Sequence, residues 1–255
     1  MNILISNDDG IHAQGIQALE SKIASLGNTF VVAPDRNCSG AATSLSIDKP
    51  LRIHRFKDNH IAVEGTPTDC VHLATTGILP VSPDIVISGI NKGSNLSDDV
   101  WYSGTVAAAR EGRNLGLTAM AFSLCTEGAT QYHFDSAAEV AYELVKHQIN
   151  HGLPKGMLLN INIPNCPIEE IQGYHITRLG ARHKPGKAII ETDPRGRPLY
   201  WIGKVGDPKD ASEGTDFHAI AHRFVSITPL ALCITLNSAI GDLEDWVGHL
   251  SKSLL

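Results

Sequence analysis

In Asn2-Ile3-Leu4-Ile5-Ser6-Asn7-Asp8-Asp9-Gly10, a short apolar run predicts a strand that leads directly into a polar turn. Apolar residues then recur at helical spacing from position 16 to position 26, and Gly27 is placed to end the helix. A second apolar run follows over residues 29–33 and stops at Pro34. This order of strand, helix and strand is typical of a parallel sheet with crossover helices.

The same alternation continues to residue 163. Apolar or β-rich runs predict short strands or a hairpin over residues 44–63, and strands over 84–88, 117–124 and 157–163. Helices are predicted from the capping pair Thr66-Pro67 onward, over 104–115 and over 136–147. We therefore predict an α/β fold with a doubly wound, mostly parallel sheet.

The pattern changes after Pro164. Short strands are predicted over residues 176–179, 188–192 and 199–202, and a final helix over 239–250. An isolated hairpin is marginal in water, so we expect this antiparallel arm to pack in a homodimer or homotetramer. The prediction is one domain with a core over residues 1–170, an oligomerisation arm over 171–235 and a C-terminal helix over 236–255.

Composition and charge exclude several classes of protein. A chain of 255 residues with 42% hydrophobic and 19% charged residues can form a folded globular domain. A net charge of -6 argues against binding a nucleic-acid polymer, although a small nucleotide beside a metal ion is compatible with it. The sequence shows neither a signal peptide nor a membrane-spanning run, and its 5 cysteines form no CxxC pair. We therefore expect a cytoplasmic protein with reduced thiols and no membrane partner.

Three polar clusters fall where predicted strands end, at residues 7–10, 37–40 and 89–95. Ligands of open parallel sheets bind outside the carboxyl ends of the strands, so these clusters are expected to converge. The adjacent carboxylates of Asp8 and Asp9 repel each other unless solvent or a cation neutralises them. The Ser39 hydroxyl and the Asn91 amide add further hard oxygen donors, a set that selects Mg²⁺ or Mn²⁺.

Each of these residues also has a purely structural interpretation. Asp9-Gly10 is a common hairpin turn, Ser39 a loop hydroxyl and Asn91 an Asx-turn residue. However, helical periodicity follows Gly10 where a hairpin requires a partner strand. The joint placement of these residues at strand ends therefore favours a site.

Other polar groups in the chain favour structural roles, and two other classes of protein fit the sequence less well. Asp98-Asp99 precedes a helix start, where the helix dipole favours acids, so we expect a structural role for this pair. His218 and His222 have the i, i+4 spacing of a helical metal pair but lack the glutamate of zinc hydrolases. A phosphoacceptor signalling domain needs an aspartate where this chain has Ile87-Ser88-Gly89. A nucleotide-binding module without catalysis is disfavoured because GxxxxGK[ST] and GxGxxG are absent.

A series of linked motifs, in order along nearly the whole chain, resembles the SurE family of survival proteins. The motifs are Ile5-Ser6-Asn7-Asp8-Asp9-Gly10-Ile11, Ala33-Pro34-Asp35-Arg36 with Ser39-Gly40, Gly65-Thr66-Pro67-Thr68-Asp69-Cys70-Val71, Ser88-Gly89-Ile90-Asn91-Lys92-Gly93-Ser94-Asn95-Leu96, Tyr102-Ser103-Gly104-Thr105-Val106-Ala107-Ala108-Ala109-Arg110-Glu111 and Glu213-Gly214-Thr215-Asp216.

The resemblance implies a Rossmann-like core and a 5′/3′-nucleotidase that hydrolyses nucleoside monophosphates, with some members also acting on polyphosphate. It implies one divalent metal ion held by Asp8, Asp9, Ser39 and Asn91, and oligomers that exchange C-terminal segments. Cys38 departs from the basic or polar residue expected at its position. This departure bears on substrate contacts beside Ser39 rather than on the metal.

Metal-assisted hydrolysis needs an activated water molecule and a site for the phosphate. Asp8 or Asp9 is expected to orient or deprotonate the water, and the sequence does not decide between them. Ser103, Gly104 and Thr105 open a predicted helix, whose free N–H groups and hydroxyls suit a phosphate, an ordinary N-cap being the alternative. The Asn95 amide is a further candidate donor to the phosphate.

Overall fold

The first strand, β1 (Asn2–Ser6), lies inside a nine-stranded sheet and pairs in parallel with β2 (Asn28–Pro34) and β5 (Ile85–Lys92). The structure is a computed structural model that describes residues 1–153 and 157–251. The other strands of this sheet are β3 (Ile53–Lys57), β4 (His60–Val63), β6 (Thr118–Cys125), β7 (Leu158–Pro164), β8 (Tyr174–Ile176) and β13 (Val225–Leu230).

The strand order is β3-β4-β2-β1-β5-β6-β7-β13-β8. Six successive strands from β4 to β7 are parallel, while β3 is antiparallel to β4 and β13 is antiparallel to β7. The strand order changes direction at β1, because β2 lies on one side of β1 and β5 lies on its other side. The predicted doubly wound, mostly parallel α/β fold is thus confirmed, and the carboxyl ends of β1, β2 and β5 meet at one edge.

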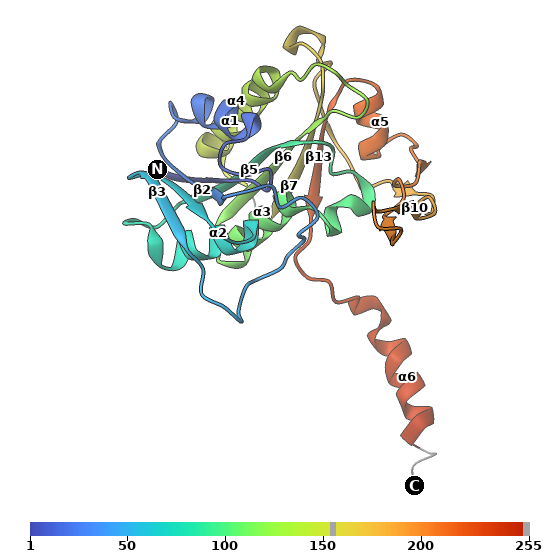
Figure 1. The fold of residues 1–255 in the computed structure, drawn as a ribbon. Helices are drawn as coiled ribbons and strands as arrows, with labels where there is room; N and C mark the ends of the chain where they lie inside the picture. Colours follow the sequence, from blue (N-terminus) through green and yellow to red (C-terminus); the bar gives the residue numbers. More distant parts are fainter. Residues whose placement is uncertain (154–156, 252–255) are drawn as a thin grey trace.

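Helices cover both faces of the sheet (Figure 1). One face carries α1 (Gln14–Ile23) and α4 (Phe134–His151), and the other carries α2 (Pro67–Leu73) and α3 (Gly104–Asn114). Each face has its own apolar core, with Ile5 and Phe122 on the first face and Leu4 and Val106 on the second. The alternation of Leu4 and Ile5 shows why the strand is apolar at successive positions: both of its faces are buried.

Helix α2 begins as predicted. The Thr66 side chain accepts a hydrogen bond from the Asp69 N–H (3.1 Å), and the Asp69 carboxylate accepts one from the Thr66 N–H (2.9 Å). Pro67 fills the first helical position, where its missing N–H costs nothing. This capping box fixes the start of the helix.

Strand β5 extends further than the predicted strand 84–88. A bulge between Ser88 and Asn91 lets the strand continue, so that Asn91 lies opposite Ser123 of β6 rather than in a loop. Gly89 is required at this bulge, because its φ is +131° and an added Cβ would lie 2.3 Å from the Phe122 carbonyl oxygen. The predicted loop 89–102 is therefore shorter than expected.

The predicted arm over residues 171–235 divides between two locations. Its first and last strands, β8 and β13, join the central sheet, where β13 pairs with β7. The remaining part holds the pair β9 (Ala181–Arg182) and β12 (Pro208–Asp210), the hairpin β10 (Ile189–Thr192) and β11 (Pro198–Trp201), and α5 (Asp216–Ala221). The separate antiparallel part is therefore smaller than predicted.

The chain ends in α6 (Ile240–Ser251), which extends away from the body of the molecule (Figure 1). This helix agrees with the predicted helix 239–250, while residues 252–255 of the predicted C-terminal segment lie outside the described residues. Across residues 1–153 and 157–251, none of the helices has the length and apolar character needed to cross a bilayer.

Candidate active site

Backbone hydrogen bonds join the three predicted polar clusters at the carboxyl edge of the sheet. The Cys38 N–H donates to the Asp8 carbonyl oxygen (2.7 Å), which places the loop carrying Ser39 against the end of β1. The Lys92 N–H donates to Asp9 Oδ2 (2.9 Å), which places the strand carrying Asn91 beside the same turn. The expected convergence of the clusters around Asp8 and Asp9 therefore follows from two specific contacts.

Asp8 is held in a buried position at the start of α3. Only 3% of its surface is exposed, and its Oδ1 accepts a hydrogen bond from the Thr105 hydroxyl (2.5 Å). The pKa of the Asp8 carboxyl is raised to about 6, chiefly by burial. The hydrogen bond from the Thr105 side chain lowers this pKa, the neighbouring Asp9 raises it, and backbone hydrogen bonds lower it. A nearby cation would stabilise this carboxylate strongly, because few polar groups compensate for its burial.

Gly104 allows α3 to approach Asp8 closely. A Cβ at this position would lie 2.6 Å from Asp8 Cβ and 2.9 Å from Asp8 Oδ2. No side chain fits in this space without moving the carboxylate or the helix. The glycine at the first position of the helix is thus part of the geometry of the site.

Asp9 and Asn91 are less buried than Asp8. Burial raises the pKa of Asp9, and the Lys92 backbone N–H and ammonium oppose this effect. The Asn91 amide nitrogen donates to the Gly93 carbonyl oxygen (2.9 Å), which fixes the amide and leaves its oxygen as the atom available to a ligand. Ser39 lies on an exposed loop, where its backbone N–H donates to Asn37 Oδ1 (2.8 Å) in an Asx turn.

These residues fit a hard divalent cation. Two adjacent carboxylates, one of them destabilised by burial, lie at the end of β1. The segments that carry the Asn91 amide and the Ser39 hydroxyl are hydrogen-bonded to this turn. The donor atoms of Asp8, Asp9, Ser39 and Asn91 are all oxygens, a set that suits Mg²⁺ or Mn²⁺ better than zinc.

The predicted phosphate residues make contacts within the protein. Ser103 caps α3, since its hydroxyl accepts a hydrogen bond from the Val106 N–H (3.1 Å), as the N-cap alternative predicts. The Thr105 hydroxyl donates to Asp8 and is fully buried. A phosphate at this helix end would therefore meet backbone N–H groups rather than the Thr105 hydroxyl. Direct contact of these residues with a phosphate remains a prediction.

Asn95 belongs to a buried network of amides. Its Nδ2 donates to the Ser123 hydroxyl (2.7 Å), and its backbone N–H donates to Asn162 Oδ1 (2.8 Å). Its carbonyl oxygen accepts hydrogen bonds from the amides of Asn160 (2.8 Å) and Asn162 (3.0 Å). The network holds the loop that follows β5. Asn95 is only 5% exposed, and a contact of its amide with substrate remains a prediction.

Asp99, Asp216 and His222 make hydrogen bonds within the protein. Asp99 accepts hydrogen bonds from Arg182, with Nη2 at 2.6 Å and Nε at 3.1 Å. The buried Asp216 accepts hydrogen bonds from the backbone N–H groups of Ser97 and Gly180, so the motif at residues 213–216 connects two loops. His222 Nδ1 lies 2.8 Å from the His218 carbonyl oxygen, within one helix.

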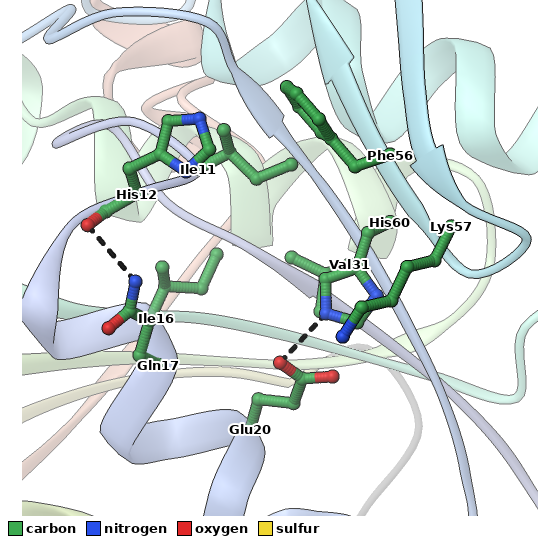
Figure 2. Close-up of a pocket in the computed structure, with 9 residues that line it drawn as sticks. All are labelled: Ile11, His12, Ile16, Gln17, Glu20, Val31, Phe56, Lys57 and His60. Carbon is green, nitrogen blue, oxygen red and sulfur yellow. Dashed lines mark hydrogen bonds and ion pairs between the residues drawn. The ribbon is translucent and has the colours of Figure 1, made fainter.

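A cavity of about 360 Å³ lies between α1 and the β3–β4 hairpin (Figure 2). Glu20 and His60 face each other in it, 2.9 Å apart, and connect the helix to the edge of the sheet. The lining residues are Ile11, His12, Ile16, Gln17, Glu20, Val31, Phe56, Lys57 and His60. None of the predicted metal or phosphate residues is among them, whereas Asp9 lines a separate cavity of about 250 Å³ with Lys92 and Tyr132.

Two features of the site were missed by the sequence analysis. The first is the hydrogen bond from Thr105 to Asp8, and the second is the need for a glycine at position 104. From the sequence we interpret Ser103-Gly104-Thr105 as a phosphate site or an ordinary N-cap, and neither interpretation includes a contact with Asp8. The available signal was a small residue at a helix start directly after a polar loop, a position that permits close packing.

The fold and the site define a doubly wound α/β protein with paired carboxylates at the carboxyl edge of its parallel strands. The family model described as Survival protein SurE matches residues 3–185. The chain therefore belongs to the SurE family.

Individual proteins agree with this assignment. The chain is 51% identical over 250 residues to a 5′-nucleotidase SurE of Coxiella burnetii strain Dugway 5J108-111, an alignment that covers 98% of this chain and 96% of that protein. The same values hold for the protein of strain RSA 331. The crystal structure of SurE protein from Aquifex aeolicus superposes with a TM-score of 0.85 at 42% identity, covering 96% of this chain and 99% of that chain.

Proposed function

We propose that this chain is a metal-dependent phosphomonoesterase that hydrolyses nucleoside 5′-monophosphates, and 3′-monophosphates, to nucleoside and phosphate. The observation that carries the proposal is the arrangement of Asp8 and Asp9 between the start of α3 and the end of β5. The relatives named 5′-nucleotidase SurE, at 51% identity over nearly the whole chain, support the substrate class.

The proposed site has metal ligands and a phosphate-binding helix end. Asp8, Asp9, Ser39 and Asn91 would hold one Mg²⁺ or Mn²⁺ ion. When bound, this ion supplies Lewis-acid polarisation of the phosphoryl group and neutralises developing negative charge. The N-terminal end of α3 adds the positive end of a helix dipole where the phosphate is expected.

We assign the second carboxylate, Asp9, to the water molecule. Asp8 is almost fully buried and one of its oxygens is occupied by the Thr105 hydroxyl, whereas Asp9 is more exposed and lines an open cavity. A general base must reach the proton that it removes, so the accessible carboxylate is the better candidate to orient or deprotonate the attacking water.

Phosphate release tests this function. The purified full chain is incubated with a panel of nucleoside 5′- and 3′-monophosphates and with polyphosphate, with EDTA, with Mn²⁺ and with Mg²⁺. We expect hydrolysis of the monophosphates that EDTA abolishes and either metal restores, because all proposed ligands are hard oxygens. Full activity in a metal-stripped sample would contradict the metal-dependent mechanism. The polyphosphate sample tests a further exopolyphosphatase activity.

We also propose that the protein is a homodimer or homotetramer in the cytoplasm. Apolar side chains are exposed along the separate hairpin and the C-terminal segment, among them Ile190 (66%), Ile202 (97%) and Ile234 (78%). An apolar groove of about 670 Å³, lined in part by Leu144, Met157 and Ile176, lies open on the body. Exposed apolar surface of this kind favours contact between copies. All 5 cysteines are free, which fits a reducing compartment.

A further inference from the structure

Two exposed aromatic side chains directly precede the candidate phosphate site. Trp101 ends the short 3₁₀ helix Ser97–Trp101 and is 51% exposed, and Tyr102 follows it with 69% of its surface exposed. Ser103, which caps α3, is the next residue. Two residues span at most about 7 Å, so the Tyr102 backbone is close to Gly104 and hence to Asp8.

The backbone that carries Tyr102 is firmly held although its ring is exposed. The N–H groups of Tyr102 and Ser103 both donate to the Asp99 carbonyl oxygen, at 3.0 Å and 3.1 Å. The Asp99 carboxylate is in turn paired with Arg182 (2.6 Å). A ring on a fixed backbone loses little conformational freedom when a ligand packs against it.

The loop that carries Ser39 connects Asp8 to Tyr102. At one end the Cys38 N–H donates to the Asp8 carbonyl oxygen (2.7 Å), and at the other the Ala42 N–H donates to the Tyr102 carbonyl oxygen (3.2 Å). The loop that carries Ser39 is therefore tied to Asp8 at one end and to Tyr102 at the other. A substrate whose phosphate binds at Asp8 and Asp9 would have Tyr102 on the same side of the molecule as its other end.

The rings of Trp101 and Tyr102 differ in the groups that pack on their faces. The Arg110 guanidinium lies 5.5 Å from the centre of the Trp101 ring, so a cation occupies one face of the indole. Within the part of the chain that the structure describes, no aromatic ring or cation is stacked on Tyr102. Tyr102 is thus the ring that is open to a planar ligand.

We propose that Tyr102 stacks against the base of the nucleotide substrate and makes the enzyme prefer phosphate esters that carry an aromatic base. The proposal rests on the proposed function, since it places the base relative to the phosphate at Asp8 and Asp9. Every base has a flat aromatic face, so stacking accepts all of them, and larger purines gain more contact than pyrimidines. A hydrogen-bonding pocket for one base is not required.

The test compares substrates with and without a base in the full-length protein. The kcat and KM values for AMP, CMP and ribose 5-phosphate are measured for the wild type, Tyr102→Ala and Tyr102→Phe. We expect Tyr102→Ala to raise the KM for AMP about 10-fold, because the stacking contact between the ring and the base is lost. The KM for CMP should rise less, because the smaller pyrimidine has less stacking contact to lose. The value for ribose 5-phosphate should not change, and Tyr102→Phe should resemble the wild type. Tyr200→Ala is the matched control, because Tyr200 is 67% exposed and lies in β11.

An equal effect on AMP and ribose 5-phosphate, or no effect on either, would overturn the proposal. A fall in the mass of Tyr102→Ala in light scattering, together with equal effects on both substrates, would instead place Tyr102 in a contact between copies. Adenosine binding, followed by saturation-transfer NMR, needs no turnover: its loss in Tyr102→Ala supports the proposal and its retention contradicts it. If the wild type hydrolyses neither AMP nor ribose 5-phosphate, the proposed function fails while the adenosine measurement still decides the role of Tyr102.

Discussion

The carboxyl edge of the sheet and the C-terminal part of the chain differ in which side chains are buried. At the edge, polar side chains are buried: Asp8 is 3% exposed and Thr105 is 0% exposed. These two side chains are hydrogen-bonded to each other. In the hairpin and α6, apolar groups remain in water, including Ile202 at 97% and Trp246 at 61% exposure. Burying a polar group is unfavourable without a partner, and exposing a large apolar surface is unfavourable without a cover. Asp8 and Thr105 therefore satisfy each other within one chain, whereas we expect a second copy to cover the C-terminal part.

The largest effect is expected from removing a charge at the edge. Asp8→Asn and Asp9→Asn keep the size and one oxygen but each removes a negative charge, so kcat at limiting Mn²⁺ should fall at least about 100-fold. Raising Mn²⁺ should recover part of the activity of Asp8→Asn. The kcat of Asp9→Asn should stay low even at saturating metal, because the water would lose its base.

The measurement is kcat as a function of Mn²⁺ concentration for both variants. Recovery of Asp9→Asn but not of Asp8→Asn would exchange the two roles. Near-normal kcat and metal affinity in both variants would show that the two acids form only a turn.

The next effect tests how tightly the edge is packed. In Gly104→Ala the added methyl group would lie 2.6 Å from Asp8 Cβ, so the carboxylate or α3 must move. We expect kcat/KM for AMP to fall about 10-fold or more, since small displacements of catalytic groups are costly. Gly77→Ala is the control, because a Cβ at Gly77 meets nothing within 4 Å. Equal activity of the two variants would mean that the contact of Gly104 with Asp8 does not matter.

A smaller effect separates support of Asp8 from contact with the phosphate. Thr105→Val removes the hydroxyl that donates to Asp8 Oδ1, whereas Thr105→Ser keeps it. We expect the valine variant to bind Mn²⁺ about 10-fold more weakly in equilibrium dialysis, as for other groups that orient metal ligands, and the serine variant to bind normally. Inhibition by inorganic phosphate at saturating metal should be unchanged. Weaker phosphate inhibition with normal metal affinity would instead make Thr105 a phosphate contact.

The smallest effect on catalysis is expected in the C-terminal part. Deleting residues 188–202, or introducing Ile202→Lys, should lower the mass in light scattering while kcat per subunit changes little. The reason is that these residues lie outside the edge and their apolar surface is expected to be covered by another copy. Ile47→Lys is a matched control, because Ile47 is 87% exposed and lies outside the hairpin. A monomeric mass for the intact protein would contradict the assembly.

The sequence predicts the central fold well because its signals are local. The buried strand β1 is apolar at three successive positions, from Ile3 to Ile5. The start of α2 is encoded by Thr66, Pro67 and Asp69. The extension of β5 was missed because Gly89 ends the apolar run, although the bulge lets the strand continue to Lys92. Strand β13 was not predicted, and the strand predicted over 176–179, near β8, was assigned to the arm instead of the main sheet. Pairing between distant strands is a tertiary effect that short runs do not encode.

The same limit applies to the site. The positions of Asp8, Asp9 and Asn91 at strand ends predict that they converge, and two backbone contacts bring their segments together. The sequence does not show toward which helix a side chain turns after a strand ends. Asp8 points to α3, where it accepts the hydrogen bond from the Thr105 hydroxyl. This orientation depends on packing between two segments that are 97 positions apart in the sequence. Metal binding by these residues remains a prediction.

The buried amides around Asn95 have a consequence for folding. In the native register of β6 and β7, Asn160 is opposite Ala121 and Asn162 is opposite Ser123, and both amides reach the Asn95 carbonyl oxygen. A slip of β7 by one residue would turn both amides to the other face of the sheet and bring Ile161 toward Asn95. Each buried polar group left without a partner would cost about 1–3 kcal/mol. The loop that follows β5 therefore favours the native register of β6 and β7, two strands that come later in the chain. A slipped register would leave the Asn95 carbonyl oxygen without these amide partners.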